Sequence, residues 1–90
     1  MTDDTELKLA IIEKLARKKV TGGNKKRVDT VKGWFRNSDQ GKVETLIREL
    51  STDPTAPVER YGGGARDNVR LTSIAAARQY LENHGEDVWF

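Results

Sequence analysis

The segment VERYGGGARDNVRL, residues 58–71, decides the fold that this sequence predicts. In each half of it, side chains of one face alternate with those of the other, as in a pair of antiparallel strands: Val58 and Arg60 against Glu59 and Tyr61, then Val69 and Leu71 against Asn68 and Arg70. The connection, about 62–68, contains three consecutive glycines and is too long for a two-residue turn. We therefore expect a β-hairpin whose glycine-rich loop projects from the protein.

Two helices are expected near the start of the chain. Residues 4–18 carry apolar side chains over an arc wider than a single stripe, so this helix should contact two partners. Residues 24–35 should form a shorter helix with Asn24 as its N-cap. Its buried face should contain three apolar residues: Val28, Val31 and Phe35. A very short strand at 20–21 is expected between the two helices.

The third helix has the clearest amphipathic pattern of the chain and should span 38–52. Its buried residues recur at i, i+3, i+4 and i+7: Val43, Leu46, Ile47 and Leu50. Asn37 or Ser38 is its expected N-cap. It should end before Asp53-Pro54, because the residue before a proline avoids the helical region of backbone conformation.

A fourth helix should follow the hairpin, with Thr72 or Ser73 as its N-cap. His84 and Gly85 should end it, because glycine is common just after a helix and histidine in the last turn interacts favourably with the helix dipole. These elements predict an α+β fold, mainly α, in a single domain that covers residues 1–90.

Charge is distributed unevenly along the chain. The net charge of the 90 residues is only +2. Residues 17–36, however, contain eight basic residues and one acid, which is a local net charge of +7. Such an asymmetry indicates one basic face, and it favours a polyanionic partner over a solvated surface that binds nothing.

Several classes of function find little support in the residues. The chain has no cysteine, which excludes a disulfide framework and a thiolate metal site. His84, the single histidine, has the position of a helix-end residue, and the glycines at 62–64 lack the spacing of a phosphate-binding loop. We see no pattern of a signal peptide or membrane span. The expectation is a cytoplasmic protein that is not an enzyme and uses no cofactor, metal or membrane.

The order of the elements resembles that of the winged helix-turn-helix family. That order is helix, short strand, helix, helix, strand, glycine-rich loop, strand and helix, and the match covers nearly the whole chain. The stretches LIRELSTDPTAPVERYGGG and AARQYLENHGEDV are also similar to small winged-helix proteins common in archaea. The turn at 36–38 departs from the tightest helix-turn-helix connection. The resemblance implies a three-helix core, a β-hairpin "wing" and a C-terminal helix.

In function, the resemblance implies sequence-specific binding of double-stranded DNA by a small transcriptional regulator. The third helix would enter the major groove, and the wing would rest on the backbone or in the minor groove. The implied contacts of the third helix are polar or small: Asn37, Ser38, Gln40, Gly41, Lys42, Thr45 and Arg48. The hairpin would add Gly63 and Arg66 at the tip, with Arg60 and Arg70 on the strands. The basic segment would add phosphate contacts: Arg17, Lys18, Lys19, Lys25, Lys26 and Arg27.

A protein-interaction module is the main alternative, because winged-helix folds also bind proteins. Its candidate contacts are Trp34 and the C-terminal Val88-Trp89-Phe90, since aromatic residues are favoured at interface hot spots. Packing against the core is the favoured alternative for Trp34, and for the C-terminal pair it is equally open. A homodimer formed through the last helix and the C-terminus fits either function. RNA binding ranks third, because no aromatic sheet motif or GXXG clamp is present.

Overall fold

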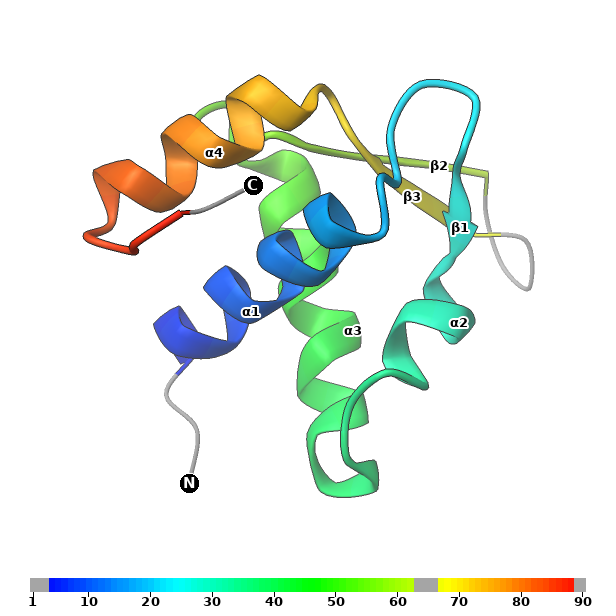
Figure 1. Ribbon diagram of the computed structural model, residues 1–90. Coiled ribbons are helices and arrows are strands. Elements are labelled where there is room, and N and C mark those ends of the chain that lie inside the picture. Colours follow the sequence, from blue (N-terminus) through cyan, green and yellow to red (C-terminus); the bar gives the residue numbers. More distant parts are fainter. Residues whose placement is uncertain (1–3, 63–66, 89–90) are drawn as a thin grey trace.

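The computed structural model describes residues 4–62 and 67–88 (Figure 1). Its elements in chain order are α1 (Asp4–Arg17), β1 (Lys26–Arg27), α2 (Val28–Lys32), α3 (Asn37–Thr52), β2 (Val58–Tyr61), β3 (Asn68–Leu71) and α4 (Ile74–Asn83). The fold is a small α+β arrangement, mainly helical, with a three-stranded antiparallel sheet. The coarse fold class predicted from the sequence is confirmed. None of the described helices is long and apolar enough to cross a membrane.

The hairpin has the strands that the alternation predicted, β2 and β3. Val58 lies opposite Leu71 and Tyr61 lies opposite Asn68. The sheet order is β1-β3-β2, so β3 is the central strand. Near the predicted short strand at 20–21, Thr21 makes an isolated bridge to Leu71 instead of starting a strand of its own. The strand that completes the sheet is β1, five residues further along the chain.

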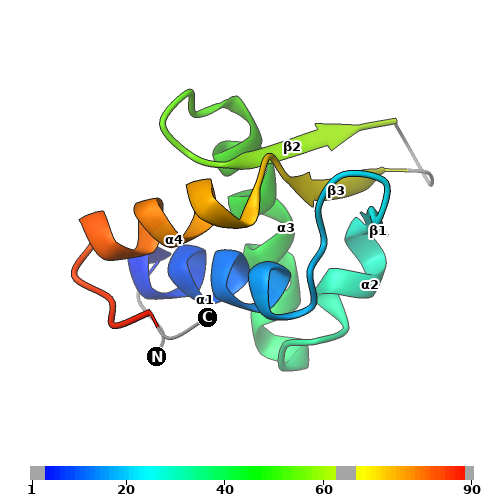
Figure 2. The same cartoon turned by 45° about the horizontal axis from the view of Figure 1, so that its top comes forward.

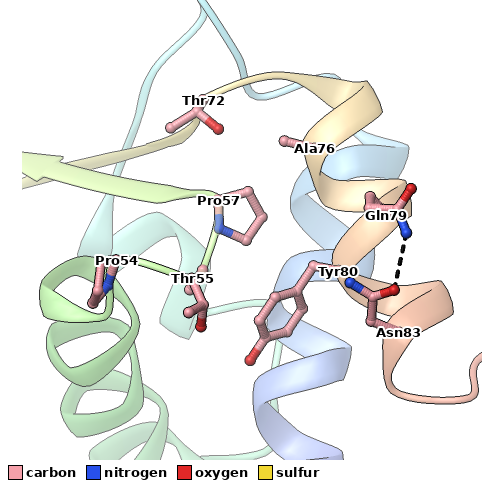
Figure 3. Close-up of a pocket in the computed structure, with 9 residues that line it drawn as sticks. Pro54, Thr55, Pro57, Thr72, Ala76, Gln79, Tyr80 and Asn83 are labelled. Atoms are coloured by element: carbon pink, nitrogen blue, oxygen red, sulfur yellow. Dashed lines mark hydrogen bonds between the residues drawn. The ribbon is translucent and has the colours of Figure 1, made fainter.

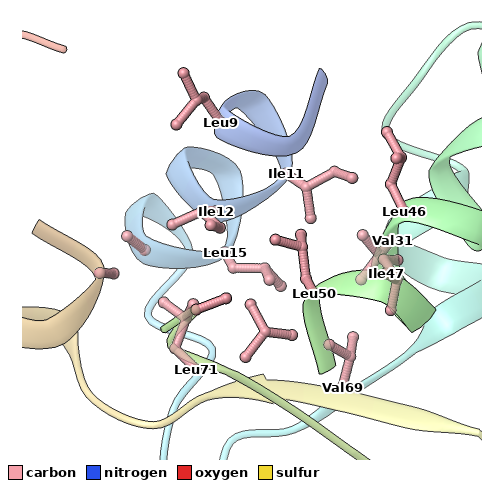
Figure 4. Close-up of a cluster of buried hydrophobic side chains, with 14 of the residues drawn as sticks. Leu9, Ile11, Ile12, Leu15, Val31, Leu46, Ile47, Leu50, Val69 and Leu71 are labelled. Atoms are coloured by element: carbon pink, nitrogen blue, oxygen red, sulfur yellow. The ribbon is translucent and has the colours of Figure 1, made fainter. Parts of the chain in front are cut away.

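The core lies between the helices and one face of the sheet, and it consists of aliphatic side chains together with Tyr80 (Figure 4). The wide apolar arc of α1 is explained by its neighbours, because α1 contacts both α3 and α4. Ile11, Ile12 and Leu15 have no exposed surface. Full burial of such a side chain contributes about 1.5–3 kcal/mol. The four apolar residues predicted for the buried face of α3 are all buried.

The helix predicted at 24–35 is wrong at both ends. Lys26 and Arg27 are extended and pair with β3, so the helix begins only at Val28, whose N–H donates to the carbonyl of Asp67 at 3.0 Å. Asn24 is not an N-cap, and its side-chain amide donates to the carbonyl of Lys19 at 2.8 Å. Pairing with a central strand satisfies the backbone of 26–27, and helix propensity is too weak a preference to compete with it.

At α3 and α4, the predicted caps include one further error and two confirmations. At α3 the N-cap position is Arg36, without a side-chain cap, so the prediction of Asn37 or Ser38 is wrong. At α4, Ser73 Oγ accepts from the N–H of Ala76 at 2.9 Å, as expected of an N-cap. After α4, Gly85 has the positive φ of 82° that favours glycine at this position.

Candidate nucleic-acid interface

The three-stranded sheet has a core face and an outer face. Residues directly opposite each other in an antiparallel pair point to the same face. The pair Val58–Leu71 is buried and so marks the core face. The outer face therefore carries the next pair, Glu59 and Arg70, and the row of Arg27, Asn68 and Tyr61. In Figure 2, α1 and α3 lie on the core side of β2 and β3.

Tyr61 and Arg70 organise the outer face. The ring centroid of Tyr61 lies 5.1 Å from Lys25 Nζ and 5.1 Å from Arg70 Cζ. Arg70 donates from Nε to Oε2 of Glu59 and from Nη1 to the carbonyl of Gly22, both at 2.8 Å. The hydrogen bond to Glu59 is the main reason that the pKa of Arg70 is raised above its ordinary value.

A basic surface runs from the end of α1 to β1. We use this term for five cations that form no ion pair with any carboxylate in the described part of the chain: Lys18, Lys19, Lys25, Lys26 and Arg27. Arg17, predicted to belong with them, is paired with Glu13 at 2.8 Å. The uncompensated positive charge of 17–36 is therefore concentrated between α1 and α2, beside the sheet.

The exposed face of α3 is polar, as predicted, but its cations have partners. Ser38, Gly41, Lys42, Thr45 and Arg48 are exposed. Two ion pairs hold the basic residues of this set: Lys42 Nζ lies 3.5 Å from Asp4 Oδ2, and Arg48 Nη2 lies 3.3 Å from Glu44 Oε1. This face offers hydrogen-bonding groups and little net positive charge.

Gln40 and Gly41 differ in how much the fold requires them. Gln40 Nε2 is 3.3 Å from the carbonyl of Phe35 and 3.3 Å from Asn37 Oδ1, so its side chain and that of Asn37 hold the turn before α3. A Cβ atom at Gly41 would meet nothing within 4 Å. Glycine lowers helix stability by about 1 kcal/mol relative to alanine. Neither packing nor backbone conformation explains its presence in α3.

The two strand arginines lie on opposite faces of the hairpin. Arg60 is opposite Val69 and so belongs to the core face, where its Nη1 lies 3.9 Å from Asp67 Oδ2. Arg70 belongs to the outer face. Gly63 and Arg66, predicted for the wing tip, lie outside the described residues. The structure therefore does not bring Arg60 and Arg70 together, although both were predicted to support the wing.

The predicted residues form two groups that are separated along α3. Figures 1 and 2 both show the first turn of α3 and the three-stranded sheet at opposite ends of the molecule. A helix of 16 residues is about 24 Å long. The first group lies at the sheet and contains Lys25, Lys26, Arg27 and Arg70. The second group lies at the far end of α3, in residues 37–42. The helix α2 lies between the groups, because it contacts both β1 and α3.

Trp34 packs against the hydrophobic core and is half-buried. Lys18 Nζ lies 4.8 Å from the centroid of its ring and covers part of the remaining surface. The core-packing interpretation of Trp34 is therefore confirmed. Residues 89 and 90 lie outside the described part of the chain, and Val88 is partly buried against the core.

A shallow hollow of about 320 Å³ lies between the connection from α3 to β2 and the helix α4 (Figure 3). Pro57, Ala76 and Tyr80 form its apolar part, and Thr55 and Gln79 are among its polar residues. Burial raises the pKa of the Tyr80 phenol above its ordinary value. The lining contains no charged side chain, so this hollow has no charge to offer a phosphate.

Sequence reasoning missed Tyr61 as a candidate functional residue. The alternation alone places Tyr61 on the same face as Glu59, and a hairpin register would have added Arg70 to that face. The contact with Lys25 had no sequence signal, because 25–27 was expected to be helical.

Among the described residues, no cluster of histidine, aspartate and glutamate has the arrangement of a metal site. No protein-family model, curated protein or solved structure matches the chain.

Proposed function

We propose that this protein is a winged helix-turn-helix protein that binds double-stranded DNA, as a small sequence-specific transcriptional regulator of the cytoplasm. The fold is compatible with that family, since three helices are followed by a hairpin that pairs with a short strand between the first two helices. The observation that carries the proposal is the basic surface, because five cations without carboxylate partners are a strong electrostatic footprint for a polyanion.

In this proposal the basic surface binds phosphates, and α3 contacts the major groove. Backbone contacts position a protein on DNA, and contacts to base edges specify the sequence. Ser38, Thr45 and Arg48 have groups that can donate to or accept from base edges. The ion pair between Arg48 and Glu44 is exposed and contributes only about 0–1 kcal/mol, so exchange for a DNA acceptor costs little.

The carboxylates on α3 have a role in the same proposal. Asp39, Glu44 and Glu49 reduce the attraction of this helix for generic DNA. A carboxylate in a groove accepts from cytosine but repels most other contacts, which favours discrimination over affinity.

The alternative, a protein-interaction module, has less support. Trp34 is packed against the core and under Lys18, so no described aromatic side chain is fully exposed. A homodimer through α4 and the C-terminus stays a prediction that is compatible with DNA binding.

The test is the salt dependence of binding to duplex DNA. If about five or six cations contact phosphates, the log–log slope of the binding constant against salt is about −5. Replacing Lys26 and Arg27 by alanine should reduce the slope to about −3, at about 0.9 per lost contact.

The control for that experiment is Lys8→Ala with Arg78→Ala, which removes two positive charges from α1 and α4. It should leave the slope nearly unchanged. Equal effects of the two double variants, or no binding of the wild-type protein to duplex DNA at low salt, would refute the proposed function.

A further inference from the structure

We propose that Lys25, Tyr61 and Arg70 form a phosphate-binding site on the outer face of the sheet, and that its ligand is a phosphodiester group of the DNA backbone. The identity of that ligand rests on the proposed function. The site adds Tyr61 to the predicted contacts and gives the sheet a role of its own, apart from α3 and the hairpin tip.

Three segments that are distant in the sequence meet at this site. Lys25 precedes β1, Tyr61 ends β2 and Arg70 lies in β3. The ring of Tyr61 is the shared element, since Lys25 Nζ and Arg70 Cζ are each 5.1 Å from its centroid. An aromatic face attracts cations, so the ring brings both positive groups to one side chain.

The guanidinium of Arg70 is held in a defined orientation. Its contacts with Glu59 and with the carbonyl of Gly22 use two of its five N–H groups. The remaining N–H groups are available for Tyr61 and for an acceptor from outside the protein. A guanidinium that is already fixed loses less conformational entropy on binding, and its planar geometry suits phosphate oxygens.

The charge balance of the site favours an anion. The negative charge of Glu59 compensates the positive charge of Arg70, but Lys25 has no carboxylate partner among the described residues. The net charge of Lys25, Glu59 and Arg70 is therefore +1. Arg27 adds a further positive charge on the same face, in the row of Tyr61. Cations gathered on one part of a surface repel one another, and an anion bound there lowers this repulsion.

The surroundings favour a polymer backbone as the source of the phosphate. The site lies on the outer face of a sheet, and Arg27 of the basic surface lies on the same face, whereas Lys26, opposite Val69, belongs to the core face. The hollow described above lies at α4, and none of its lining residues belongs to this site. An extended backbone can contact successive cations on an open face, whereas a small phosphate ligand usually binds in a concave pocket.

The experiment compares three single variants with the wild-type protein by fluorescence anisotropy on a labelled duplex at several salt concentrations. Tyr61→Leu removes the aromatic face without changing the charge, Tyr61→Phe keeps the face, and Lys25→Ala removes one cation. Lys8→Ala is the matched control, because it removes one positive charge from α1, outside the basic surface, at a residue that contacts no aromatic ring in the described part of the chain. Thermal melts establish that each variant is folded.

The expected result is that Tyr61→Leu weakens duplex binding about fivefold, which is the size of effect that loss of a cation–π contact produces. Tyr61→Phe should bind like the wild type. Lys25→Ala should weaken binding more than Lys8→Ala does, and should lower the salt slope by about one. Wild-type affinity in Tyr61→Leu, or equal effects of Lys25→Ala and Lys8→Ala, would overturn the site.

A second measurement separates failure of the site from failure of the proposed function. Inorganic phosphate is titrated into the wild-type protein and backbone amide shifts are followed by nuclear magnetic resonance. If the protein binds no duplex, shifts at Lys25, Tyr61 and Arg70 that Tyr61→Leu abolishes would retain the phosphate site and reject DNA as its ligand. Absence of shifts at these residues, together with absence of duplex binding, would reject both.

Discussion

Lys32 Nζ lies 3.2 Å from Glu44 Oε2, so an ion pair joins α2 to α3. The Lys32 side chain is only 23% exposed, and Asp29 on its own helix lies further away, at 3.8 Å. The helix α2 has only five residues and is too short to be stable alone. Its orientation therefore depends on contacts such as this one and on the burial of Val28 and Val31.

We predict that Lys32→Met lowers the free energy of unfolding by about 0.5–1 kcal/mol, the range for partly exposed ion pairs. Glu44→Gln should lower the free energy of unfolding by at least as much, because it also removes the ion pair with Arg48. A double-mutant cycle measured by urea denaturation gives the coupling between the two side chains. Strictly additive effects would show that the pair contributes nothing to the packing of α2 on α3.

The two serines near helix starts should behave differently. Ser73→Ala removes the side-chain acceptor for the N–H of Ala76 and should destabilise the protein by about 1 kcal/mol. Ser38→Ala is the matched change at α3, where the structure has no side-chain cap, and should have a much smaller effect. Thermal unfolding of both variants is the measurement. A larger loss for Ser38→Ala would contradict the observed start of α3.

Gly41→Ala should separate stability from function. The new methyl group meets no atom within 4 Å, so the helix should gain up to about 1 kcal/mol. The same methyl group lies on the exposed face of α3, and we expect it to weaken duplex binding by obstructing close approach. Unfolding curves and binding isotherms of the same preparation test both effects.

Gly85→Ala is the control for Gly41→Ala. It places a Cβ atom at a φ of 82° and should destabilise the protein by about 1 kcal/mol, while it leaves α3 untouched. Unchanged DNA affinity in Gly41→Ala would show that no ligand approaches α3 closely at this position.

Asp53 predicts a pH dependence in the acid range. Its Oδ1 accepts from the N–H and the hydroxyl of Thr55, at 2.9 and 2.8 Å, and these hydrogen bonds hold the pKa of Asp53 below its ordinary value. A carboxyl group with a depressed folded-state pKa stabilises the fold above its unfolded pKa. That contribution is lost as the pH falls through the folded pKa.

Thr55→Val removes the hydroxyl and keeps the backbone donor, so the pKa of Asp53 should rise toward its ordinary value. An NMR titration of the Asp53 carboxyl group measures this change. Thr52→Val is the control, because the Thr52 hydroxyl donates to the carbonyl of Glu49 and to no carboxylate. An Asp53 pKa that is identical in Thr55→Val and the wild type would show that the backbone donor alone sets it.

The candidate site could be predicted only in part. The charge count correctly found the basic segment, and the periodicity of α3 correctly found its exposed face. The sequence could not predict which partner each charged side chain has. Lys42 pairs with Asp4, and Arg70 donates to the carbonyl of Gly22, and in each case the two residues are far apart in the chain. The contact of Tyr61 with Arg70 depends on the register of β2 with β3. Its contact with Lys25 depends on the non-helical conformation of 24–27.

The sequence by itself determined the elements whose signal is local: the alternating strands of the hairpin, the apolar stripes of α1 and α3, the serine cap of α4 and the glycine that follows it. These depend on side-chain spacing and on backbone preferences within one or two turns. Only the tertiary structure decided that residues 24–27 are not helical. Backbone hydrogen bonds with the edge of β3 outweigh a weak helical preference there. For the same reason the tertiary structure decided which cations are neutralised and which remain free for a ligand: ion pairs depend on distances of a few ångströms between segments that only the packed core brings together.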